Sequence, residues 1–146
     1  MREIDYVVIY SYIRGMMQRR TDIVLSVLEE EFSVCKVEDY SQVDVSRPFV
    51  FTGSTDEERS LVCPAGMVPS NASARSDGWR AFRIEGILDF SLTGILSGIS
   101  SVLADNGIGI FAVSTFNTDY ILTRAENLDV AVSVLSQAGY IIKQPE

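Results

Sequence analysis

Two short polar clusters hold the side chains with which this chain could bind a ligand. The first is DFSLTG, residues 89–94, and the second is STFNTD, residues 114–119. Both clusters combine carboxylates and hydroxyls, and neither contains a His, a Cys or the spacing of a metal site. Such groups suit the binding of a small polar ligand better than the making or breaking of a bond.

The first cluster lies between an expected strand and an expected helix. The first turn of a helix leaves backbone N–H groups unpaired, and the helix dipole favours an anion beside them. Asp89 or Ser91 could instead cap the helix, and one turn could do both. The candidate ligand-binding residues of this loop are Asp89, Phe90, Ser91, Leu92, Thr93, Gly94 and Ile95.

The second cluster lies at the turn between two expected strands. Its Ser, Thr, Asn and Asp residues could be ordinary turn residues, or Asp119 could accept hydrogen bonds from an ammonium group. A carboxylate at the helix N-terminus and an ammonium group at Asp119 would together hold a zwitterionic amino acid. The candidate ligand-binding residues at this strand end are Val113, Ser114, Thr115 and Asp119.

Composition argues against several functional classes. The chain has 146 residues, a net charge of −8 and two lysines, so it lacks the basic surface that nucleic acids or anionic membranes require. No His is present, which removes the commonest general base and metal ligand. No apolar run is long enough for a membrane span. We therefore expect no catalytic residue, no metal and no cofactor; an enzyme using Asp89, Asp119 or Cys63 is the least favoured alternative.

The two cysteines lie in apolar, strand-like segments, 28 residues apart. Because free cysteine is among the most buried residue types, we expect Cys35 and Cys63 to be buried thiols in a reducing cytoplasm. A redox pair would more often show CxxC spacing.

The second half of the chain predicts a βαββαβ order. Alternation predicts a strand over 79–86, and three- and four-residue spacing predicts a helix over 91–106. The remaining expected elements are strands over 108–115, 119–123 and 140–143 and a helix over 125–138. This is an α+β, ferredoxin-like arrangement with helices on one face of an antiparallel sheet.

The first half is rich in strands. Residues 22–28 and 32–37 are expected to form a hairpin around a charged turn at 29–31, and residues 49–52 and 59–63 to pair around a turn at 53–58. Pro, Gly, Asn and Ser over 64–78 indicate a loop or linker. These strands are the candidates for covering the sheet face that the helices leave open.

Residues 1–20 are apolar and aromatic, with four Arg among them. They lack the features of a signal peptide. They could form an extra edge strand, or translation could begin at Met16 or Met17; we favour the second interpretation.

The stretch LDFSLTGILSGISSVLADNGIGIFAVSTFNTDYILTR, residues 88–124, resembles an ACT domain. It is most similar to the aspartate-kinase type and to small bacterial proteins related to animal arginine sensors of the CASTOR family. The upstream segments DEERSLVCP and WRAFRIEG resemble the same bacterial proteins, so the resemblance covers about residues 21–141.

The resemblance implies a domain organisation and a function. Residues 21–78 would be a truncated, strand-rich ACT-like unit, residues 79–146 a complete ACT domain, and residues 1–20 an extension of uncertain status. The chain would be a cytoplasmic regulatory module that binds a free amino acid at the two polar clusters. It would signal through a homodimer or a protein partner. The alternative is an interaction or dimerisation module that binds no ligand.

Overall fold

The computed structural model describes residues 22–86 and 94–145. Within these ranges the first half contains β1 (Val24–Val37), β2 (Phe51–Ser54), β3 (Arg59–Pro64), the 3-10 helix η2 (Ala65–Met67) and β4 (Ala72–Ile84). The second half contains α2 (Ile95–Asp105), β5 (Ile110–Ser114), β6 (Asp119–Arg124), the 3-10 helix η3 (Ala125–Asn127), α3 (Leu128–Gln137) and β7 (Ile141–Lys143). The order from β4 to β7 is the predicted βαββαβ order, and the fold is α+β.

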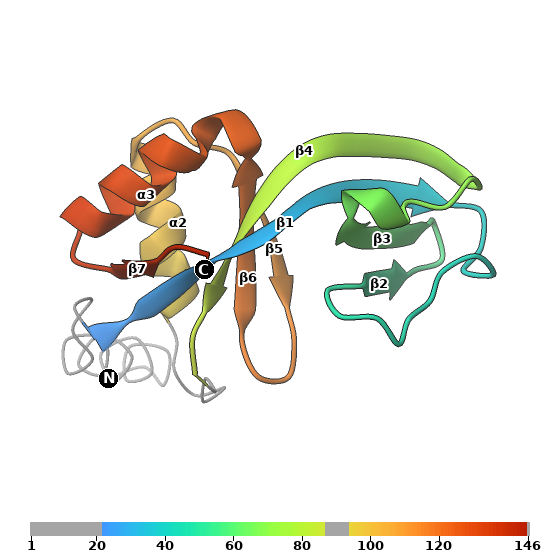
Figure 1. The fold of residues 1–146 in the computed structure, drawn as a ribbon, viewed down its shortest axis with the longest axis horizontal. Helices are drawn as coiled ribbons and strands as arrows, with labels where there is room; N and C mark the ends of the chain where they lie inside the picture. Colours follow the sequence, from blue (N-terminus) through green and yellow to red (C-terminus); the bar gives the residue numbers. More distant parts are fainter. Residues whose placement is uncertain (1–21, 87–93, 146) are drawn as a thin grey trace, which may run out of the picture.

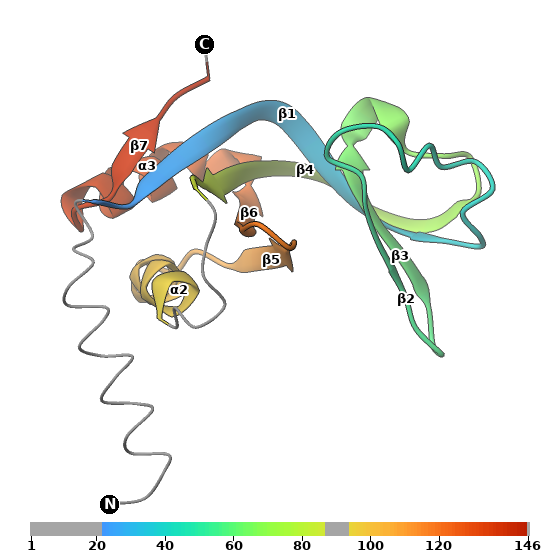
Figure 2. The ribbon, with the colours of Figure 1, turned by 90° about the horizontal axis from the view of Figure 1, so that it is seen from below.

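One seven-stranded sheet runs through both halves of the protein. Its strand order is β2-β3-β1-β4-β6-β5, with β7 added in parallel to β1. The antiparallel strands β1 and β4, of 14 and 13 residues, cross from the helical end to the β2–β3 end and bend on the way (Figures 1 and 2). The boundary expected between residues 78 and 79 therefore falls inside β4, a strand that both halves share.

The expected hairpin over residues 22–37 is wrong, because Val24–Val37 form the single strand β1. The three glutamates at 29–31 sit at a bulge: Val27 pairs with Phe82 and Glu31 pairs with Arg80, so β1 carries extra residues here. A tight reversal would need residues such as Gly or Asn that tolerate a positive φ, and this segment has none. A bulge keeps the strand continuous while it accommodates the charged side chains.

The expected loop over residues 64–78 is also partly wrong. After η2, residues from Ala72 onward pair with β1, with Val37 opposite Ala72 and Cys35 opposite Arg75. Most side chains in this part of β4 are exposed, so the segment carries no apolar alternation that a sequence pattern could detect. The predicted helix over 125–138 divides into η3 and α3.

Helices α2 and α3 cover one face of the sheet. Phe82 of β4 and Ile121 of β6 are fully buried there against Ile99 of α2 and Leu135 of α3. Burial of each such side chain contributes roughly 1.5–3 kcal/mol. This core fixes the helices on the sheet.

The opposite face is covered in part by the first half of the chain, as the sequence suggested. The ring of Tyr120 on β6 lies 5.1 Å from the ring of Phe51 and 6.4 Å from that of Phe49, measured between ring centroids. Phe49 has a φ of 63°, a conformation that is unfavourable for a bulky residue. The bend in β1 and β4 brings these rings together, so one sheet builds a core on both of its faces.

The two halves contain equivalent hairpins. Thr55 and Thr115 lie 60 residues apart, and each donates a backbone hydrogen bond across its turn, Thr55 to Glu58 at 2.8 Å and Thr115 to Thr118 at 2.9 Å. A 3-10 helix follows each hairpin at the same separation, beginning at Ala65 and Ala125. The first half lacks counterparts of α2 and α3 within the described residues.

Candidate functional site

Most of the first predicted cluster, Asp89, Phe90, Ser91, Leu92 and Thr93, lies outside the described residues. Its last two members, Gly94 and Ile95, are described. Gly94 is the N-cap residue of α2, with a φ of 96°, and Ile95 begins the helix. Gly86, on the other side of the loop, has a φ of 91°. The loop is therefore bounded by two glycines in a conformation that other residues adopt only with strain.

Among the described residues, no side chain caps the N-terminus of α2, because Gly94 occupies the cap position. Gly94 accepts a hydrogen bond at its carbonyl oxygen from the N–H of Gly98, at 2.8 Å, which closes the first helical turn. The N–H groups of that turn precede this bond and are available in principle to a ligand. The capping roles expected for Asp89 and Ser91 fall outside the described residues.

The second predicted cluster lies at the β5–β6 turn. Ser114 and Asp119 are the last cross-strand pair before the turn, so their backbones are adjacent. The Thr115 hydroxyl donates a hydrogen bond to the carbonyl oxygen of Thr118 at 3.1 Å. This bond stabilises the turn, which is the alternative to ligand binding that the residue types allow. The Thr115 hydroxyl is thus hydrogen-bonded within its own turn. The side chain of Asp119 is half-buried.

Thr118 is a structural residue of this region that the sequence analysis missed. Its side chain is buried, with 6% of its surface exposed, and its hydroxyl donates a 2.6 Å hydrogen bond to the carbonyl oxygen of Ile84 at the end of β4. This bond ties the β5–β6 turn to the strand that leads into the residue 87–93 loop. No sequence signal identifies its inward orientation, because Glu58 occupies the equivalent position before β3 and is exposed.

The other predicted ligand-binding residues that the structure describes do not all lie at one site. Ile95 packs against the core beneath the helices, whereas Val113 packs against the aromatic cluster on the opposite face of the sheet. Ser114 is exposed. The structure thus places Asp119, Ser114 and Thr115 in one turn and holds that turn to β4 through Thr118, while Ile95 and Val113 serve separate cores.

The cysteines are buried and free, as predicted. Burial raises the pKa of the Cys63 thiol to about 11, and it also raises the pKa of Cys35. Both side chains are therefore protonated thiols near neutral pH, and neither is an activated nucleophile. Among the described residues, no group of His, Cys, Asp and Glu side chains has the arrangement of a metal site. No helix in that part of the chain is long and apolar enough to cross a bilayer.

Comparison with known proteins places this geometry in a family. The family model of the ACT domain matches residues 74–137. The chain is 31% identical to the protein Atu0741 from Agobacterium tumefaciens, with a TM-score of 0.76, over 85% of this chain and 94% of that one.

More distant structures share the fold. VC0802 from Vibrio cholerae, a protein of unknown function described as a possible transport protein, is 17% identical, with a TM-score of 0.67 over 87% of this chain and 98% of that one. The regulatory subunit of aspartate kinase from Thermus thermophilus is 9% identical, with a TM-score of 0.55 over 78% of this chain and 95% of that one. No curated protein matches the chain. Sequence, topology and the match to the family model agree with the resemblance noted above, and the chain belongs to the ACT domain family.

Proposed function

We propose that this protein is a regulatory module that binds a free amino acid between the β4–α2 loop and the β5–β6 turn. The observation that supports the proposal is the hydrogen bond between Thr118 and Ile84, because it joins the β5–β6 turn to the end of β4, from which the chain continues toward residues 89–94. The fold of aspartate-kinase regulatory subunits supports a regulatory role for the same architecture.

Each end of the ligand would meet a group suited to it. The N-terminus of α2, at Gly94, would bind the carboxylate, and the half-buried Asp119 would bind the ammonium group. The remaining contacts would come from Asp89, Phe90, Ser91, Leu92, Thr93, Ile95, Val113, Ser114 and Thr115. Binding would favour one arrangement of the protein over another only through a difference in affinity between them.

The wider organisation that we propose has two ACT-like units, residues 21–78 and 79–146, which share β4. The equivalent hairpins, 60 residues apart, support this division. Output would pass through a homodimer or a protein partner. The two free thiols favour a cytoplasmic location.

A thermal-shift screen against the twenty amino acids tests the proposal, because a ligand that binds only the folded state raises its melting temperature. We expect one or a few amino acids to raise Tm, and Asp119→Ala to weaken that effect, whereas Asp105→Ala, at the far end of α2, should leave it unchanged. A flat screen at concentrations of about 10 mM, or an unchanged response of Asp119→Ala, would contradict the site.

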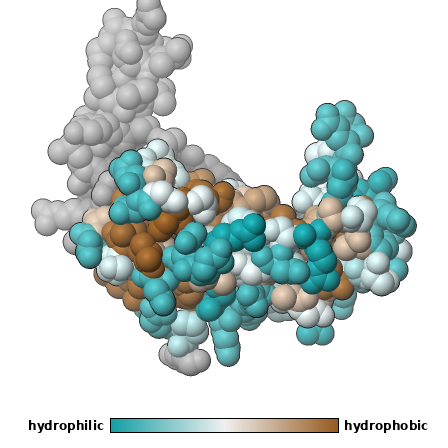
Figure 3. Space-filling model, turned by 90° about the horizontal axis from the view of Figure 1, so that it is seen from above, coloured by the Kyte–Doolittle hydropathy of each residue, from teal (hydrophilic) through white to brown (hydrophobic). Residues whose placement is uncertain are grey.

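The second candidate is an interaction module that binds no ligand. Apolar surface is visible over the helical end of the molecule (Figure 3). Val130 on α3 and Ile141 on the short edge strand β7 are large apolar residues, with 52% and 46% of their surface exposed. Under this hypothesis Val130→Lys would weaken self-association or partner binding, while the amino-acid screen would stay flat.

A further inference from the structure

A buried polar side chain, Thr123, and a half-buried one, Arg80, lie across β6 and β4, beneath the start of the C-terminal helix. Arg80 and Thr123 are directly opposite each other in the antiparallel pairing, so their side chains share one face of the sheet. Phe82 and Ile121, the pair two positions away in the same antiparallel ladder, belong to the core under the helices. Arg80 and Thr123 therefore point toward the helical layer.

Both side chains carry hydrogen-bond donors that find no acceptor among the described residues. Thr123 is 0% exposed, and its hydroxyl has no partner. Arg80 donates from Nη2 to the carbonyl oxygen of Leu28 at 2.9 Å, but its buried Nε–H is without a partner. Buried polar groups of native proteins are nearly always paired, so two adjacent exceptions require an explanation.

A third set of donors lies beside them. Two residues after Thr123 the chain enters η3, which lies against β4 and continues into the ten-residue helix α3. Neither η3 nor α3 has a side-chain cap. The first N–H groups of this helical segment, the Thr123 hydroxyl and the Arg80 guanidinium are all donors, and the dipole of α3 adds partial positive charge.

The other half of the protein shows how such a site is completed. Cys63 lies 60 residues before Thr123, and its cross-strand partner is Ser33, as Arg80 is the partner of Thr123. Ser33 is also 0% exposed, but its hydroxyl donates to the carboxylate of Asp77 at 2.5 Å. At this position the first half supplies an anionic oxygen from its own chain, whereas no described carboxylate of the second half bonds to the Thr123 hydroxyl or to Nε of Arg80.

We propose that Arg80, Thr123 and the first turn of the η3–α3 segment form a binding site for a small oxyanion, either a carboxylate or a phosphate group. A guanidinium and a hydroxyl side by side match the oxygens of such groups. Thr123 lies near the opposite end of β6 from Asp119, so this site is separate from the proposed amino-acid site and does not rest on it.

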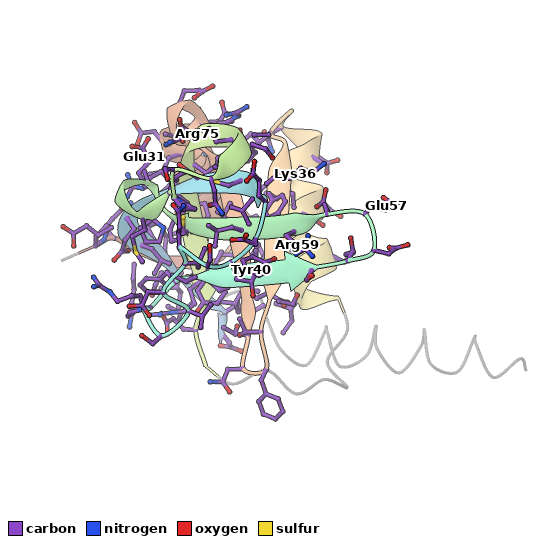
Figure 4. All side chains as sticks on the ribbon, turned by 90° about the vertical axis from the view of Figure 1, so that its right-hand side faces the viewer. Glu31, Lys36, Tyr40, Glu57, Arg59 and Arg75 are labelled. Carbon is purple, nitrogen blue, oxygen red and sulfur yellow. The ribbon has the colours of Figure 1, made fainter. Side chains whose placement is uncertain are left out.

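Three carboxylates near the site influence which ligand it prefers. Glu31 is exposed and is the cross-strand neighbour of Arg80 on β1, and Glu126 and Asp129 lie in the first turns of the helical segment. Figure 4 shows Glu31 on the same side of the sheet as Arg75. These side chains repel a free anion and attract a positive charge, so an oxyanion that carries an ammonium group is favoured over acetate.

The test compares four forms of the full chain: wild type, Arg80→Met, Thr123→Val and the control Arg83→Met. Arg83 lies on the same strand, but its guanidinium is already paired with Glu85, with 3.2 Å between Nε and Oε1. Thermal unfolding and amide NMR spectra are recorded in sodium chloride and then in phosphate, acetate or glycine at matched ionic strength. Addition of Glu31→Gln distinguishes glycine bound through both its charges from glycine bound as a carboxylate alone.

For the wild type we expect saturable shifts of the Ala125 and Glu126 amide signals and a rise in Tm. Arg83→Met should keep both effects, and Arg80→Met and Thr123→Val should lose them. Thr123→Val without the anion should unfold at the same temperature as the wild type or higher, because its methyl group replaces a hydroxyl that lacks an acceptor. A response to phosphate alone, or to acetate and glycine alone, identifies the ligand class.

Two results would overturn the proposal. One is the absence of saturable amide shifts at about 100 mM of each anion, a concentration that fills a site of millimolar Kd. The other is an equal rise in Tm in all four forms, which would be the general effect of excluded salts. Should Arg80→Met fail to fold, the near-isosteric Thr123→Val decides the matter alone.

Discussion

The hydroxyl of Thr118 donates a 2.6 Å hydrogen bond to the backbone carbonyl of Ile84, 34 residues earlier in the chain. Ile84 ends β4, and Thr118 is the last residue of the β5–β6 turn. The bond therefore extends the pairing of β4 with β6, in which Arg83 lies opposite Tyr120, into the turn. It makes Thr118 a positioning residue for the turn that contains Asp119.

Replacement of Thr118 by Val should destabilise the fold by about 1–3 kcal/mol, because the Ile84 carbonyl loses its donor while it stays buried. Thr118→Ser keeps the hydroxyl and should cost less, about 1 kcal/mol for the lost methyl group. Urea unfolding of the two variants measures both values. Equal losses for Val and Ser would show that the methyl group, and not the hydrogen bond, is what matters.

Gly94→Ala should destabilise the protein by about 1–2 kcal/mol, since an L-residue at a φ of 96° is strained. An added Cβ at this position meets no atom within 4 Å, so the backbone alone accounts for the cost. Gly53 has equally open space and no positive φ, and Gly53→Ala is therefore the matched control. Denaturant midpoints that fall equally for the two variants would rule out strain as the cause.

Gly98 on α2 lies against Tyr140. A Cβ added to Gly98 would be 3.0 Å from the Tyr140 hydroxyl oxygen, and Tyr140 is buried and has little room to move. Gly98→Ala should therefore destabilise the fold, although alanine is the better helix former by about 1 kcal/mol.

A double-mutant cycle checks the contact between these two residues. In a Tyr140→Phe background the hydroxyl is absent, so Gly98→Ala should become neutral or stabilising. Free energies of unfolding of the four forms give the coupling. Additive effects would mean that the helix, and not the tyrosine, determines the cost.

Asp77 should make stability depend on pH in acid. Hydrogen bonds from Ser33 and then Arg75 hold the pKa of its carboxyl group below the ordinary 3.8. A folded-state pKa below the unfolded value stabilises the protein above that unfolded value, and the contribution is lost as the pH falls through the lower, folded pKa. The Tm of Asp77→Asn should lie below that of the wild type at pH 6, and the gap should narrow below pH 3.8.

A comparison with Asp56→Asn, in the exposed turn between β2 and β3, isolates this effect. That turn projects at the end of the molecule where Figure 4 labels Glu57. If Asp56→Asn and Asp77→Asn show the same dependence of Tm on pH, the bonds to Ser33 and Arg75 contribute nothing specific.

The periodic parts of the sequence predicted the fold well. Residues such as Ile99, Leu103, Ala131 and Leu135 recur at helical spacing and form the buried face of the two helices. The strands of the second half and their βαββαβ order followed from alternation. The assignment of the chain to the ACT family also followed from the sequence, because residues 88–124 resemble an ACT domain.

The errors arose where the structure depends on distant pairing. Glu29 to Glu31 interrupt the apolar pattern of β1, yet the strand continues because β4 is available alongside. Residues 72–78 show no pattern, since their side chains are exposed on both faces. At the candidate sites the sequence indicated Asp119 and Gly94 but not Thr118 or Thr123. The hydroxyl of Thr118 has its partner 34 residues away, and that of Thr123 lacks a partner among the described residues, and neither fact leaves a pattern in the sequence.

The shared strands also determine how the protein can respond to a ligand. Because β1 and β4 pass without a break from one half to the other, these two strands, and not a linker, join the halves within the described residues. If the twist of the sheet beneath the helices changed and the bulges between β1 and β4 did not absorb it, both strands would carry the change to the β2–β3 arm at the far end. The two strands would then act as a lever, converting a small displacement near Asp119 into a larger one at the tip of that arm.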